Sequence, residues 1–225
     1  MLRRILFTFL AFTFISFMVT GCAKKEKPEE KKAAQKKFVP AKRPAPSDAH
    51  ITEERVIFSF EDSLDGWEIP EWAIEKDDHV AEKLEISKDV AKEGRSSAKV
   101  TCDFSGKRWT AAVIELEQFY DFTPYREIAV DVFIPDEAPM GLKGKIILTI
   151  GDDWKFAEMT RSSPLVPGEW IAIKANIEPG SYDWKRIVPD DAFRADVRKI
   201  VVRVESNKSP VYKGPVYIDN MRIGK

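Results

Sequence analysis

The chain has 225 residues, and its 36 basic and 37 acidic side chains leave a net charge of -1. That total hides a division, because residues 1–50 carry 11 basic and 4 acidic side chains whereas residues 51–225 carry 25 and 33. The acidic part lacks the basic balance of a nucleic-acid-binding protein, and two Cys and two His exclude a disulfide scaffold, a multi-cysteine zinc site and most histidine-based chemistry.

Residues 1–21 have the pattern of a secretory signal peptide. Arg3 and Arg4 precede about 15 mostly apolar residues, too few to span a bilayer as a helix, which needs roughly 20. The signal helix ends at Val19-Thr20-Gly21-Cys22, which resembles the lipobox of bacterial lipoproteins. The resemblance implies cleavage before Cys22 and lipidation of Cys22, so that acyl chains anchor the protein in a lipid bilayer. Ala23 in place of Asp favours the outer membrane; the alternative is an ordinary signal peptide with a nearby cysteine.

Residues 22–50 predict the lipidated cysteine followed by a disordered linker. The segment 23–50 contains 9 basic residues, 4 acidic residues and four prolines, with Phe38 and Val39 as its only large apolar side chains. So little apolar surface cannot offset the entropy lost on ordering. We expect a solvated spacer that keeps the following domain near the membrane. The alternative is that its basic side chains lie against anionic lipid headgroups.

Residues 51–225 predict one all-β domain. Apolar and polar residues alternate in several segments, which is the signal of half-buried strands. These segments are 56–60, 98–104, 128–134, 146–150, 171–177, 200–204 and 216–218. Turn residues separate them, and only 189–196 suggests a helix. Roughly eight to ten strands without long helices predict an antiparallel β-sandwich or a barrel.

The order of several motifs narrows this fold further. The domain opens with Phe58-Ser59-Phe60-Glu61-Asp62 and Leu64-Asp65-Gly66-Trp67, continues through Glu93-Gly94-Arg95-Ser96 and Pro167-Gly168-Glu169-Trp170, and closes with Tyr217-Ile218-Asp219-Asn220. Over 55–225 this order resembles the jelly-roll carbohydrate-binding modules with a galactose-binding-like sandwich. The resemblance implies an antiparallel jelly roll that binds polysaccharide or an envelope glycan, although the same fold serves other roles.

The same resemblance implies a structural calcium ion where the first strand, an inner loop and the last strand meet. The matching residues are Glu61, Glu93 and Asp219. Calcium takes six to eight oxygen ligands, and Asp219 interrupts an otherwise apolar strand and needs a partner there. The alternative is that Asp219 pairs with a Lys or Arg, or caps a turn through Asn220.

A sugar site needs an aromatic platform edged by hydrogen-bonding groups, because sugars present flat C–H faces bordered by hydroxyls. The best candidate follows the apolar segment 146–150, where aromatic and charged residues alternate. A second cluster lies in a turn-rich loop around residue 183. The predicted ligand-binding residues are Asp152, Trp154, Phe156, Glu158, Arg161, Tyr182 and Trp184.

The remaining aromatic and reactive side chains have simpler interpretations. Trp72 and Trp109 are candidate rim residues of the sugar site, whereas the positions of Trp67 and Trp170 favour packing. Cys102 alternates with apolar neighbours, which predicts a buried thiol. His79 follows two aspartates, which predicts a solvated loop residue.

No catalytic motif is present: the sequence has no G-x-S-x-G, no H-E-x-x-H and no Gly-rich phosphate loop. Acidic residues are too plentiful to single out a glycosidase pair. We therefore predict a non-catalytic glycan-binding lipoprotein of the cell envelope. The alternative is a structural lipoprotein that binds a protein partner through the same sandwich. A concave aromatic groove would favour a glycan, and a flat apolar patch above roughly 400 Å² would favour a protein.

Overall fold

The structure of this protein is a computed structural model that describes residues 51–225. The predicted signal peptide (1–21), the linker (22–50) and the lipidation of Cys22 lie outside the described residues. Within 51–225, no helix is long and apolar enough to cross a membrane.

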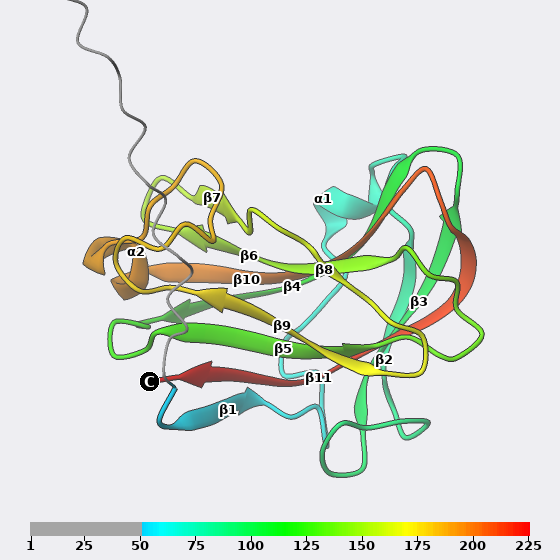
Figure 1. The fold of residues 1–225 in the computed structure, drawn as a ribbon, viewed down its shortest axis with the longest axis horizontal. Helices are drawn as coiled ribbons and strands as arrows, with labels where there is room; N and C mark the ends of the chain where they lie inside the picture. Colours follow the sequence, from blue (N-terminus) through cyan, green and yellow to red (C-terminus); the bar gives the residue numbers. More distant parts are fainter. Residues whose placement is uncertain (1–50) are drawn as a thin grey trace, which may run out of the picture. The chain divides into compact units, whose positions relative to one another are not determined.

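The described residues form eleven strands and two short helices (Figure 1). In chain order they are β1 (Glu54–Phe58), α1 (Glu71–Ile74), β2 (Ala81–Ser87), β3 (Ser97–Ser105), β4 (Trp109–Tyr120), β5 (Glu127–Phe133), β6 (Lys143–Ile150), β7 (Lys155–Glu158), β8 (Ser163–Pro164), β9 (Trp170–Asn176), α2 (Asp191–Ala195), β10 (Val197–Asn207) and β11 (Val211–Gly224).

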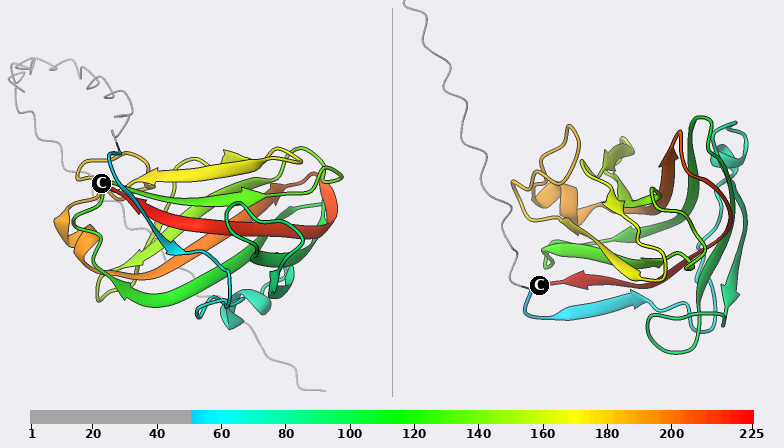
Figure 2. Two further views of the ribbon diagram at one scale, coloured as in Figure 1. Left: turned by 90° about the horizontal axis from the view of Figure 1, so that it is seen from below. Right: turned by 45° about the vertical axis from the view of Figure 1, so that its right-hand side comes forward.

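The strands build two antiparallel sheets that face each other as two layers (Figure 2). The first, called sheet A here, has the order β2-β3-β11-β5-β9, and β1 pairs with the end of β11. The second, called sheet B here, has the order β4-β10-β6-β7, and β8 pairs with the start of β6. The protein is therefore an all-β jelly-roll sandwich, as the sequence predicted.

The core lies between the two sheets and follows from the alternation of side chains along each strand. Val130 and Val132 of β5 and Val202 and Val204 of β10 belong to one core cluster, in which every side chain is at most 8% exposed. Because successive residues of a strand point to opposite faces, their neighbours lie on the outer faces of the sandwich. On the outer face of sheet B these neighbours include Val201 and Arg203, which bear on function.

All seven segments with alternating residues lie in strands or at their ends, and the helix expected in 189–196 forms as α2. Asp190 caps α2 by accepting a hydrogen bond from the backbone N–H of Phe193 at 2.7 Å. The alternation did not single out β4, because both of its faces are buried from Thr110 to Leu116 and its apolar residues run continuously. The short helix α1 was also not expected.

Candidate functional site

A groove on the outer face of sheet B is a concave site in the described part of the chain. Its volume is about 250 Å³, and α1, β4, β6, β7 and β10 contribute to it. The lining residues are Trp72, Ala73, Lys76, Asp78, His79, Trp109, Ala111, Val113, Ile147, Phe156, Val201 and Arg203. Aromatic side chains surround an apolar floor, which is the composition expected of a small-molecule or saccharide site.

The helix α1 forms one wall of this groove. Its Ala73 is 1% exposed and packs against the apolar floor, which consists of Ala111, Val113, Ile147 and Val201. The neighbouring Trp72 is turned to the groove, where its indole N–H donates to Glu115 Oε2 at 2.9 Å. A four-residue helix has little stability of its own, so packing of Ala73 on sheet B is what holds Trp72 in place.

Three aromatic side chains leave large surfaces open to a ligand. Trp72 is 42% exposed, Trp109 is 37% exposed and Phe156 is 54% exposed. A basic group lies over each of the two indoles: Lys76 Nζ is 4.4 Å from the ring centre of Trp72, and Arg203 Cζ is 5.4 Å from that of Trp109. These cation–π contacts hold the indole rings at defined orientations.

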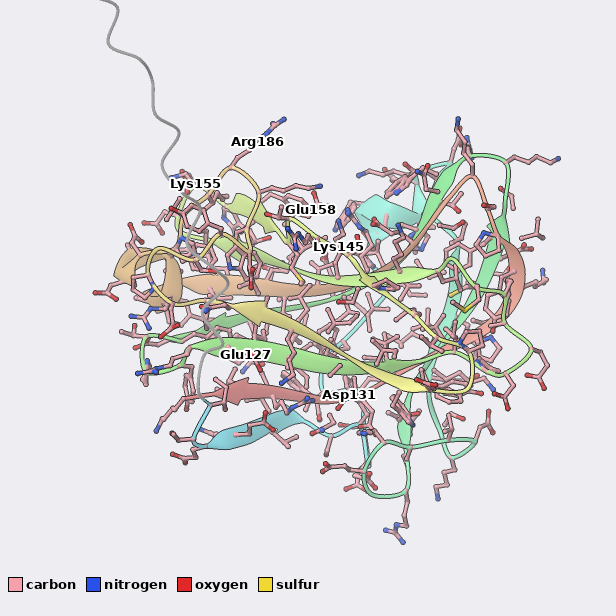
Figure 3. All side chains as sticks on the ribbon, in the orientation of Figure 1. Glu127, Asp131, Lys145, Lys155, Glu158 and Arg186 are labelled. Carbon is pink, nitrogen blue, oxygen red and sulfur yellow. The ribbon has the colours of Figure 1, made fainter. Side chains whose placement is uncertain are left out.

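Charged residues on the outer face of sheet B form one connected network beside the apolar floor. Glu158 on β7 accepts hydrogen bonds from Lys145 on β6, at 2.7 Å, and from Arg203 on β10. Lys185 approaches its other oxygen at 3.1 Å, and Glu205 also pairs with Lys145 and Arg203. Figure 3 shows Lys145 and Glu158 close together, whereas Arg186 extends away from the fold.

This network keeps Glu158 ionised. Burial opposes its ionisation, but the hydrogen bonds from Lys145 and Lys185 and the charge of Arg203 outweigh burial and lower the pKa of Glu158 to about 2. A carboxylate with such a pKa carries no proton to give at neutral pH. The network therefore offers fixed donors and acceptors to a polar ligand, and Glu158 has no protonated form that would act as a general acid.

The structure separates the ligand-binding residues expected between 152 and 161. Phe156 lines the groove, and Glu158 belongs to the charged network beside it. Trp154 is 46% exposed on the turn after β6, where Arg198 and Lys199 lie over its ring, and it does not line the groove. Asp152 is almost fully exposed and pairs with Arg198, and Arg161 is exposed between β7 and β8.

The second predicted cluster divides between surface and core. Tyr182 is exposed on the loop that follows β9. Trp184 is 3% exposed, packs against Phe193, and donates its indole N–H to the carbonyl of Asn176 at 2.8 Å. The expectation that Trp184 lies on the surface is wrong, because its polar neighbours face solvent while its ring fills the end of the sandwich and finds a backbone partner for its N–H.

Two of the three predicted calcium ligands meet at one loop. Glu61 accepts from the backbone N–H of Arg95 at 3.0 Å, and Asp219 accepts from those of Lys92 and Glu93 at 2.7 and 3.2 Å. Gly94 has φ +69°, and a Cβ at this position would overlap the Glu61 carboxylate, so only glycine allows this approach.

Glu93 does not join them, since it is exposed, and no group of three His, Cys, Asp or Glu side chains within 51–225 is arranged to hold a metal. Asp219 also accepts from the backbone N–H of Asn220 at 2.7 Å, at an irregularity within strand β11, and the turn considered as the alternative does not form there.

Two features of the same region nevertheless suit a cation. Burial raises the pKa of Asp219, and the nearby charge of Glu61 raises it further, against three backbone hydrogen bonds that lower it. Asn220 Oδ1 is buried without a hydrogen-bond partner among the described residues. Glu61 and Asp219 would supply carboxylate oxygen ligands, and calcium binding here stays a prediction.

The packing predicted for Trp67, Trp170 and Cys102 is confirmed, whereas the prediction for His79 is wrong. Trp67 is buried and packs edge-on against Phe58, and the Cys102 thiol is buried, which raises its pKa. Trp170 packs against Phe133 on the outer face of sheet A, with ring centres 5.3 Å apart. His79 is not a solvated loop residue, because it is half-buried in the groove wall.

Several groove residues escaped the sequence reasoning, although one signal marks them. Ile147 and Val201 are apolar at positions that alternation assigns to the outer face of their strands. When neighbouring strands carry apolar residues on both of their faces, the outer face is expected to be covered, here by α1 or a ligand. Arg203 continues this row on β10, so this pattern would have pointed to sheet B.

No protein-family model matches this chain, and no curated protein matches it. Among solved structures, the chain is similar to the CBM27-1 module of Caldicellulosiruptor saccharolyticus in complex with mannohexaose, with 22% identity, a TM-score of 0.52, and coverage of 76% of this chain and 96% of that one. It is also similar to a CBM28 carbohydrate-binding module specific for non-crystalline cellulose, with 15% identity, a TM-score of 0.56, and coverage of 74% and 92%. At these identities the likeness establishes the shared fold.

Proposed function

We propose that this chain is a non-catalytic glycan-binding protein of the cell envelope, anchored by a lipid on Cys22, and that a polysaccharide binds in the groove of sheet B. The observation that carries the proposal is the groove itself, in which Trp72, Trp109 and Phe156 surround an apolar floor beside a charged network. The similarity of the fold to carbohydrate-binding modules supports the same class of ligand.

The chemistry of the groove suits a saccharide. Exposed indole and phenyl rings stack against the C–H faces of sugar rings, while carboxylate and ammonium groups accept from and donate to hydroxyls. Because Glu158 and Glu205 already pair with Lys145 and Arg203, an uncharged polyhydroxylated ligand leaves none of these four groups unpaired. A shallow groove buries limited area, so we expect affinity in the micromolar to millimolar range.

The ion pairs of two carboxylates beside the groove, Glu158 and Glu115, support the proposed absence of catalysis. A glycosidase needs one protonated and one ionised carboxyl group across the scissile bond. Glu158 is held ionised by three basic side chains. Glu115 likewise forms an ion pair with Lys199 at 2.6 Å and accepts the Trp72 indole N–H. Both side chains therefore serve structure and recognition.

Affinity gel electrophoresis of the full chain tests the proposal. Gels containing mannan or non-crystalline cellulose should retard the chain relative to a gel without polysaccharide. Replacement of Trp72 or Phe156 by Ala should reduce the retardation, whereas Met140→Ala is the matched control, because Met140 is 65% exposed in the loop between β5 and β6. Retardation by no polysaccharide in a broad panel, with the chain folded, would reject glycan binding.

The alternative function, binding of a protein partner, needs a different surface. A hollow groove with a charged network suits it less than a flat apolar patch. The same panel separates the two functions, since a chain that binds only a protein partner would be retarded by no polysaccharide in it. Envelope location and the lipid anchor are proposed from Cys22 and its preceding residues.

A further inference from the structure

His79 occupies an unusual place in the groove wall. Its Nε2 lies 3.1 Å from the carbonyl oxygen of Ala81, and its Nδ1 is buried without a hydrogen-bond partner among the described residues. A carbonyl oxygen only accepts, so Nε2 carries the proton of the neutral ring and Nδ1 carries none. The structure thus fits one protonation state of this ring, the neutral one.

The backbone around His79 ties α1 to the edge of sheet B. Ala111 N–H donates to the carbonyl of Asp78 at 2.9 Å, and Val80 N–H donates to the carbonyl of Ala111 at 3.0 Å. His79 N–H donates to the carbonyl of Lys76 at 3.0 Å, in the turn that follows α1. His79 therefore lies in the connection between Trp72 on α1 and Trp109 on β4, the two indoles of the groove.

Charged residues on several elements lie around the segment that carries His79. Lys76 and Asp78 lie on its own segment, and Arg203 of β10 lines the same groove. Arg108, next to β4, donates to the carbonyl of Asp77. Asp103 of β3 donates its backbone N–H to Val80. Burial lowers the pKa of His79 from its usual 6.5; the Ala81 carbonyl and the charge of Asp78 act in the opposite direction without offsetting burial.

Protonation would place a second N–H on buried Nδ1, where no acceptor stands. An unsatisfied buried donor destabilises the fold, and more so when it carries charge. The ring can recover this loss only if the wall moves and admits water. Such a movement would displace Trp72, Trp109 or both, because their elements are joined through the residues that flank His79.

We propose that His79 is a pH-dependent control of the groove, which binds glycan with His79 neutral and loses affinity when His79 takes up a proton. The inference rests on the proposed function, since it concerns the affinity of the same groove. The stabilising effect of the neutral ring is fully present above the ordinary pKa of 6.5. It declines as the pH falls from 6.5 to the lowered pKa of the folded chain.

The first experiment needs no ligand. The chain has two histidines, His50 and His79, so a His50→Gln variant of the full chain leaves a single imidazole to follow by nuclear magnetic resonance. We expect His79 to titrate below 6.5, and the indole resonances of Trp72 or Trp109 to shift with the same midpoint. Titration at or above 6.5, or indole resonances that do not follow, would overturn the proposal.

The second experiment measures affinity with His79→Gln as the partner variant, because Gln places an N–H donor near the position of Nε2 and does not titrate. For the wild-type chain, we expect the Kd for a polysaccharide that binds at pH 7.5 to rise at least threefold at one pH unit below the measured midpoint of His79, and for H79Q to change less than 1.5-fold over the same range. An equal rise in both chains would overturn the proposal. Absence of binding at pH 7.5 would reject the proposed function instead, and the titration would still decide the role of His79.

Discussion

Arg203 on β10 and Glu158 on β7 form an ion pair that spans β6, the strand between them. Lys145 of β6 lies directly beside Arg203 in the ladder and donates to the same carboxylate at 2.7 Å. One acidic side chain thus links three neighbouring strands of sheet B on the face that carries the groove. Removing the charge of Glu158 should therefore weaken the contacts among all three strands.

Glu158→Gln should destabilise the fold at pH 7. The amide leaves Lys145, which is 4% exposed at its side chain, and Arg203 with incomplete charge compensation, and loss of one partner of a buried pair is costly. We expect a loss of about 2–3 kcal/mol in the free energy of unfolding, measured by urea denaturation. The control is Glu117→Gln, whose side chain is 61% exposed beside Lys199 and whose loss should cost less than about 0.5 kcal/mol.

The pH dependence of this contribution has a defined sign. A carboxyl whose pKa falls from 4.5 in the unfolded chain to about 2 in the fold stabilises the fold above pH 4.5, and that stabilisation is lost between 4.5 and 2. The stability difference between wild type and E158Q should therefore shrink as the pH is lowered from 5 to 2.5. A difference that stays constant over this range would contradict the role given to Glu158.

If a structural calcium ion lies between Glu61 and Asp219, its removal by a chelator should lower the thermal stability of the fold. If calcium neutralises these two carboxylates, excess chelator should lower the melting temperature by about 5–10 °C, and added calcium should restore it. Asp219→Asn should remove this response, whereas Glu93→Gln should keep it, because Glu93 is exposed. A melting temperature that chelator leaves unchanged would show that the backbone N–H groups alone satisfy these carboxylates.

If Cys22 is lipidated, the wild-type chain and Cys22→Ser should be found in different cell fractions. The wild-type chain, produced in a bacterial host with lipoprotein processing, should remain with the membrane fraction and take up labelled palmitate. Cys22→Ser should release it into the soluble fraction and abolish labelling, because one polar side chain cannot replace acyl chains worth about 0.8 kcal/mol per buried methylene. Membrane association that survives this change would refute the lipid anchor.

Trp184 and Trp154 should respond to truncation in opposite ways. Trp184→Ala removes a core side chain and should cost about 3–5 kcal/mol of stability. Trp154→Ala removes an exposed ring held by contacts with Arg198 and Lys199 and should cost less than about 1 kcal/mol. Thermal or urea denaturation of both variants makes the comparison. Equal losses would contradict the placement of Trp184 in the core.

These two tryptophans show which features of the structure could be predicted from the sequence and which could not. Alternation predicted the sandwich, because each strand buries one face and the period of two follows directly from backbone geometry. Both tryptophans have polar neighbours, yet Trp184 is buried by α2 through Phe193, a contact between segments that no local pattern encodes. Local sequence therefore predicted the strands better than it predicted which aromatic rings stay exposed.

The sequence predicted some of the groove residues but not the groove itself, again because contacts between distant segments form it. Phe156, Trp72 and Trp109 were expected near a ligand because exposed-looking aromatics suit sugars. Their convergence depends on α1, a helix of four residues without a periodic pattern, and on the register that sets Arg203 opposite Val113. Such convergence arises from tertiary packing, so the sequence named candidates without showing which of them share one groove.

The measurement that tests the central claim most directly is calorimetric titration of a polysaccharide into the wild-type chain, Trp109→Ala and Trp170→Ala, with circular dichroism to confirm that each is folded. Trp170 is a matched control, since it is a partly exposed tryptophan that packs on Phe133 of sheet A. We predict that Trp109→Ala weakens binding at least tenfold, about 1.4 kcal/mol, and that Trp170→Ala changes it less than twofold. Undiminished binding by Trp109→Ala, or an equal loss in both variants, would contradict the placement of the glycan in the groove of sheet B.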